Sequence, residues 1–101
     1  MLIYNTTYHL EEEVENNFLI WLNEVYIPKV RENELFKEIR LCRILSHIQE
    51  GNVSYTLQWT VEKSADLHVW HLNSGVELNS QITAIFKDKV LGIPTLMEVI
   101  E

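Results

Sequence analysis

The segment from residue 53 to residue 61 alternates strictly between apolar and neutral polar side chains, and this pattern constrains the fold more than any other feature of the sequence. A period of two predicts a β-strand with one buried and one open face. The apolar side chains are Val53, Tyr55, Leu57, Trp59 and Val61. The polar side chains are Ser54, Thr56, Gln58 and Thr60. A second layer of structure must therefore cover one face of this strand.

Three further segments are rich in β-branched and aromatic residues and predict strands. They lie at residues 1–9, 36–48 and 90–100. Gly51 and its neighbours predict a tight turn, which joins residues 36–48 to the alternating strand as a hairpin. Gly92 and Pro94 favour an edge position or a bulge for the last strand over a central position.

Two segments carry apolar residues at steps of three to four and predict amphipathic helices. The first follows three glutamates, and its inner side chains are Val14, Phe18, Trp21, Leu22 and Val25. Pro28 predicts that this helix ends or bends near residues 26–27. The second helix begins at Ser64, which can cap a helix N-terminus, and its apolar residues recur as far as Ile85. We expect all three tryptophans to fill the core between helices and sheet: Trp21, Trp59 and Trp70.

The order of elements is βαββαβ, which predicts the α+β fold of a ferredoxin-like sandwich. Right-handed crossovers place both helices on one face of a four-stranded antiparallel sheet whose central strands are the first and the third. A chain of 101 residues fits a single domain, so we expect one ferredoxin-like domain over residues 1–101.

The other face of the sheet is predicted to be open and uncharged. The residues expected on it are Ile3, Asn5, Thr7, His9, Ser54, Thr56, Gln58 and Thr60. Few solvated sheet faces lack lysine and glutamate, so we expect a second copy of the chain to cover this face in a homodimer. Five polar residues on it form either a ladder at the dimer interface or a site for a small ligand: Asn5, Thr7, Thr56, Gln58 and Thr60.

Composition excludes several other partners and compartments. The net charge of −7 disfavours nucleic acid and anionic membrane surfaces. A single cysteine, Cys42, forms no intramolecular disulfide, so we expect a cytoplasmic protein.

Four stretches of the sequence together resemble a bacterial family known only as domain of unknown function 4286. They are Ile3-Tyr4-Asn5-Thr6-Thr7, Trp21-Leu22 with Tyr26-Ile27-Pro28-Lys29-Val30, Val53-Ser54-Tyr55-Thr56-Leu57-Gln58-Trp59, and Thr95-Leu96-Met97-Glu98-Val99-Ile100. The resemblance covers nearly the whole chain. It implies a dimeric α/β barrel, in which two ferredoxin-like sheets pack face to face, and it implies no established activity.

Candidate chemistry is sparse in this sequence. His9, His71 and Tyr55 are the first candidates for catalytic residues if a pocket opens between sheet and helices. His68 and His71 have the spacing of two metal ligands on a helix, but no third ligand is indicated, so we expect no metal site and no cofactor. We expect an interaction or small-ligand-binding module. The alternative is a small enzyme that resembles the cofactor-independent monooxygenases or isomerases of the same superfamily.

Overall fold

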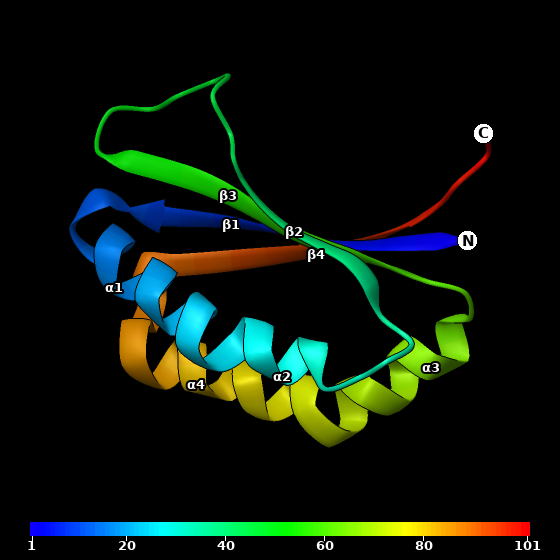
Figure 1. Cartoon of the computed structure of the whole chain (residues 1–101). Helices are drawn as coiled ribbons and strands as arrows, with labels where there is room; N and C mark the ends of the chain where they lie inside the picture. The colour runs from blue at the N-terminus through cyan, green and yellow to red at the C-terminus, as the bar shows by residue number, and fades with distance from the viewer.

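A computed structural model describes all 101 residues, and it contains one four-stranded antiparallel sheet (Figure 1). The strands are β1 (Leu2–Glu11), β2 (Lys37–Arg43), β3 (Asn52–Val61) and β4 (Val90–Glu98). Their spatial order is β2-β3-β1-β4, so the first and third strands are central and β4 is an edge strand. The helices cover one face of this sheet, which confirms the predicted ferredoxin-like fold.

Two long helical runs form the layer beneath the sheet (Figure 1). The first contains α1 (Glu15–Trp21), the π turn η2 (Leu22–Tyr26) and α2 (Ile27–Arg31). The second contains α3 (Ser64–Trp70), the π turn η3 (His71–Gly75) and α4 (Val76–Phe86). Short 3₁₀ turns, η1 (Glu12–Val14) and η4 (Lys87–Lys89), connect the runs to the strands. None of the helices combines the length and apolar character that crossing a bilayer requires.

The first helical run passes through Pro28 and continues to Arg31, so it does not end near residues 26–27, and of the two expected outcomes an irregularity in the helix is the one that the structure has there. Pro28 lies in the first turn of α2, directly after the π turn, where the missing N–H has little consequence. The π turn also inserts one residue into the helical repeat, since the Ile27 N–H donates to the Leu22 carbonyl. Tyr26 is consequently buried where the regular spacing predicts Val25, which is 37% exposed.

The second helical run differs from prediction at both ends. Ser64 forms no capping hydrogen bond, and Lys63 occupies the N-cap position instead. At the other end Ile85 is exposed and Phe86 is buried, because the buried side chains of α4 follow steps of four: Leu78, Ile82 and Phe86.

The residues of each strand that face the helices are those that the alternating sequence pattern predicts. Burial of β3 alternates along its whole length, and its predicted inward residues and all three tryptophans belong to one hydrophobic core. Strand β2 is shorter than expected, because it ends at Arg43 and residues 44–51 form a loop. A bulge between Lys37 and Arg40 interrupts its pairing with β3.

Lys87, directly after α4, adopts φ 56° and ψ −128°, a backbone conformation that disfavours any residue with a Cβ atom. Lys87→Gly should therefore raise the free energy of unfolding by about 1 kcal/mol in urea denaturation. Lys87→Ala is the matched control, since it removes the same charge and keeps the Cβ. Equal stability of the two variants would show that the backbone conformation contributes nothing.

Candidate functional site

The open face of the sheet brings the predicted polar residues together. Asn5 pairs with Gln58, and Thr7 pairs with Thr56, across the two central strands. The Asn5 side-chain amide donates to the Thr7 hydroxyl at 3.2 Å. The Thr60 hydroxyl, nearer the end of β3, donates to the Lys37 carbonyl at 3.2 Å. The five residues thus share one face, and most of their side-chain polar groups remain available to hydrogen-bond a ligand or a second protein surface.

Strand β4 adds an apolar row to this face that the sequence reasoning missed. Leu91, Ile93 and Met97 pair with β1 residues of the open face, and they are 58%, 46% and 40% exposed. The signal was present in the sequence, because these residues alternate with Gly92, Pro94 and Leu96. The open face is therefore more apolar than β1 and β3 alone indicate.

Charged side chains on the open face are confined to its margin. The register places Lys37 and Arg40 on the edge strand β2 and Glu11 at the end of β1. Cys42, which pairs with Thr56, is half-buried on the same face. The centre of the face carries no charge that would oppose contact with another protein surface.

The three predicted catalytic residues lie in three different places. His9 is on the open face, where its Nδ1 lies 2.7 Å from the Ser54 hydroxyl. Tyr55 faces the helices, and its hydroxyl donates to the Glu15 carboxylate at 2.5 Å. His71 lies in the π turn η3 of the second helical run. The sheet separates His9 from the other two, so these residues do not form one catalytic group.

Tyr55 belongs instead to a contact that ties the hairpin to the first helix. The Glu15 carboxylate also lies 3.6 Å from the Arg43 guanidinium, which stands 6.0 Å from the Tyr55 ring centre. These three residues come from α1, β2 and β3. The Tyr55 hydroxyl is thus occupied in a structural hydrogen bond.

His71 lines an apolar pocket of about 530 Å³ at the junction of the sheet and the second helical run. This pocket, which we call the apolar cavity, is open to solvent, and Ser64, Ala65, His68 and Leu96 are exposed in its wall. The cavity walls are Tyr4, Ser64, Ala65, Leu67, His68, Trp70, His71 and Leu96. The cavity lies where α3 begins with the small residues Ser64 and Ala65 and where Leu96 of the edge strand remains 47% exposed. Another cavity, of about 560 Å³, lies beneath the 44–51 loop and is lined mainly by polar residues, including His9.

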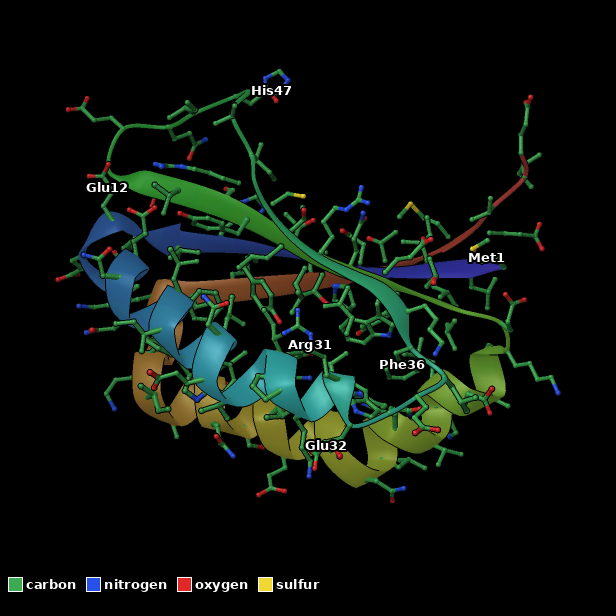
Figure 2. All side chains as sticks on the ribbon, in the orientation of Figure 1. Met1, Glu12, Arg31, Glu32, Phe36 and His47 are labelled. Carbon is green, nitrogen blue, oxygen red and sulfur yellow. The ribbon has the colours of Figure 1, made fainter.

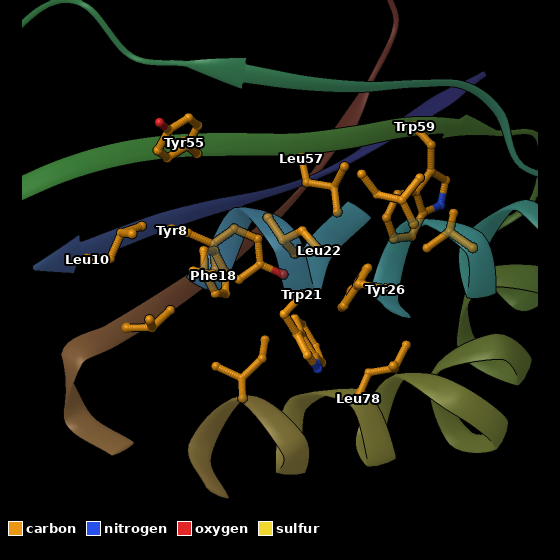
Figure 3. Close-up of a cluster of buried hydrophobic side chains, with 14 of the residues drawn as sticks. Tyr8, Leu10, Phe18, Trp21, Leu22, Tyr26, Tyr55, Leu57, Trp59 and Leu78 are labelled. Carbon is orange, nitrogen blue, oxygen red and sulfur yellow. The ribbon is translucent and has the colours of Figure 1, made fainter. Parts of the chain in front are cut away.

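Aromatic rings form the core beside the apolar cavity, and Figure 3 shows part of this cluster. Trp70 contacts Trp59, with ring centres 5.4 Å apart, and Tyr26, with ring centres 6.1 Å apart. Tyr4 contacts Trp59 at 5.2 Å. Two buried indole N–H groups in this region make no hydrogen bond within the protein: Trp59 Nε1 and Trp70 Nε1.

Gly75 lies directly against two rings of the cavity wall, those of His71 and Trp70, and its lack of a side chain leaves room for them. A Cβ atom at this position would stand 2.8 Å from His71 Nδ1 and 3.1 Å from Trp70 Cζ3. Both rings therefore pack against bare backbone in the π turn, a helical irregularity that is frequent at functional sites.

The cavity offers apolar walls, aromatic rings and two imidazoles. No group of three or more His, Cys, Asp or Glu side chains has the geometry of a metal site. Such a cavity suits an uncharged apolar ligand, and its volume lies within the range of about 300–1,000 Å³ that is typical of small-molecule sites.

Residues 1–100 match the family described as Domain of unknown function (DUF4286). The chain belongs to this family. No curated protein is similar enough in sequence to match the DUF4286 chain.

Several solved structures share the fold of this DUF4286 protein. A proposed antibiotic biosynthesis monooxygenase from Deinococcus radiodurans has a TM-score of 0.76 at 16% identity, covering 100% of this chain and 94% of its own. Another antibiotic biosynthesis monooxygenase has a TM-score of 0.72 at 17% identity, with 100% of both chains covered. An ethyl tert-butyl ether d (ethd) family protein from Bacillus halodurans has a TM-score of 0.67 at 11% identity, covering 99% of this chain and 100% of its own. At these identities the likeness shows the fold alone.

Burial raises the pKa of three tyrosines on the helix side of the sheet. It raises the pKa of Tyr8 to about 12 and that of Tyr26 further. The pKa of Tyr55 is raised by burial and by its hydrogen bond to the Glu15 carboxylate. These hydroxyls are thus held in the neutral form.

The raised tyrosine pKa values predict alkaline unfolding. A group whose folded pKa lies above its unfolded value contributes stability that is complete below the unfolded value, about 10 for tyrosine, and is lost as the pH rises through the folded value. The free energy of unfolding should therefore decrease above about pH 10. Phenolate absorbance should rise for these tyrosines only as the circular dichroism of the folded chain disappears. Ionisation of all four tyrosines with the fold intact would contradict this assignment.

Proposed function

We propose that this DUF4286 protein is a homodimeric small-ligand-binding protein. Two copies pair through their open sheet faces, and each copy holds an uncharged apolar ligand in the cavity lined by Tyr4, Trp70 and Leu96. The observation that supports ligand binding is the cavity itself, which remains open although the adjoining core is closely packed. We place the protein in the cytoplasm, because its one cysteine is a free thiol.

The dimer is supported by the composition of the open face. Its neutral centre and the exposed row of Leu91, Ile93 and Met97 match the charge-poor core of a protein interface. A single chain would leave this apolar row in water. Stacking a second sheet on this face would bury the row and leave the charged margin at the rim.

Ile93→Lys should convert the dimer to a monomer, because a lysine at this position would be buried without a partner. Light scattering at micromolar concentration measures the change in mass. Ile85→Lys is the matched control, since Ile85 is exposed to a similar extent, 54%, on helix α4 away from the open face. The dimer proposal fails if the parent chain scatters as a monomer or if Ile93→Lys remains dimeric.

Ligand binding is tested with N-phenyl-1-naphthylamine, an uncharged fluorescent probe of apolar sites. We expect saturable binding of one probe per chain. Ala65 is an exposed residue of the cavity wall, so Ala65→Trp should fill the cavity and weaken binding at least about tenfold, which corresponds to about 1.4 kcal/mol. Ala84→Trp, an equal change on the exposed side of α4, should bind as the parent does. Equal affinities of the two variants, or no saturable binding, would contradict the assignment of this cavity.

A monooxygenase is the second candidate function, and the position of His71 favours it. An imidazole in the wall of an apolar cavity can accept the proton of a bound hydroxyl group, a step that activates an organic substrate. The fold is also that of proteins named as antibiotic biosynthesis monooxygenases. Oxygen uptake that depends on both a hydroxyaromatic substrate and His71 would favour the enzyme over a binding protein.

A further inference from the structure

The three most exposed large apolar side chains lie outside the sheet and the helices. They are Ile100 at 85%, Leu45 at 77% and Ile48 at 72%. Leu45 and Ile48 belong to the loop of residues 44–51, and Ile100 belongs to the tail of residues 99–101 that follows β4. Such side chains contribute little to the stability of an isolated chain, because water surrounds most of their surface, and a contact that buried them would be favourable.

The loop and the tail rise on the same side of the sheet, opposite the helices (Figures 1 and 2). His47 marks the loop at one end of the sheet, and Met1 marks the other end, where the tail begins. Backbone hydrogen bonds hold both segments: Ile44 N–H donates to the Ser54 carbonyl at 2.9 Å, and Val99 N–H donates to the Met1 carbonyl at 2.9 Å. The two segments therefore flank the open face at its opposite ends.

The open face by itself provides a small interface. The central strands contain ten residues each, so four strands cover roughly 600 Å² per subunit. This flat contact area is smaller than the surface of roughly 800 Å² that each partner contributes to a stable protein complex of ordinary size. Contacts beyond the flat sheet would bring the dimer to the usual size.

Two-fold symmetry decides which segments can meet. An axis that lies between the two sheets and runs roughly perpendicular to the strands reverses the second subunit end for end. The loop of each subunit then stands beside the tail of the other, once at each end of the dimer. Stacking with equal ends together would instead bring the two loops to one end of the dimer and the two tails to the other, so that no loop could meet a tail.

We propose that the 44–51 loop of one subunit packs against the tail of the second copy, with Leu45 and Ile48 in contact with Ile100 across the dimer. We call this contact the clasp. This inference rests on the proposed pairing of open sheet faces. It adds the orientation of the two subunits and the residues that close the interface at its ends.

The first test measures the dimer dissociation constant by sedimentation. Ile100→Asp should raise it about ten- to hundredfold, since a buried isoleucine is replaced by a charge. Ile20→Asp is the control, because Ile20 is 53% exposed on helix α1, and it should leave the constant unchanged. A dimeric parent whose constant is the same in both variants would overturn the clasp and leave the face-to-face dimer standing. A monomeric parent would overturn both.

The second test identifies what the tail contacts. In a Cys42→Ser background, Ile48→Cys with Ile100→Cys should form a covalent dimer on oxidation. Within one chain the two positions lie at opposite ends of ten-residue strands, roughly 30 Å apart, which is too far for a disulfide. Ile48→Cys with Ile20→Cys should cross-link more slowly. If Ile100→Cys alone cross-links as fast as the 48/100 pair, the tails meet each other and the proposed orientation is wrong.

Discussion

The fold depends on the two central strands, which carry large apolar side chains on one face and polar side chains on the other. One face of β1 and β3 carries the large apolar residues, including Tyr8, Leu57 and Trp59, which are almost fully buried against the helices. The other face carries hydroxyls and amides. A shift of either strand by one residue would exchange the two sets, so burial of the aromatic side chains fixes the register of the whole sheet. The same separation leaves the neutral face that we assign to the second copy.

The helices bring their aromatic residues to this sheet through two π turns. In the first run the inserted residue turns Tyr26 inward, and in the second run the π turn begins at His71, directly after Trp70. Tyr26 and Trp70 then meet between the two helical runs, beside the apolar cavity. The irregular turns thus connect the packing of the core with the position of the proposed ligand site.

The strand order and the core follow from the sequence because period-two alternation and the tryptophans are strong local signals. The π turns do not follow from it, since no residue type specifies them, and Pro28 indicates a helix end when regular geometry is assumed. The open-face residues Asn5, Thr7, Thr56 and Gln58 could be placed from alternation alone. The cavity could not, because it depends on how far the second helix stands from β4, a distance set by side-chain packing across the whole chain.

The most direct measurement of a covered open face uses Cys42, which is the one thiol of the chain and lies half-buried on that face. Its rate of reaction with a thiol reagent such as Ellman's reagent can be followed over a range of protein concentrations. If a second copy covers the face, the rate constant falls as the concentration rises through the dimer dissociation constant. A rate constant that is the same at every concentration up to the millimolar range would contradict the account.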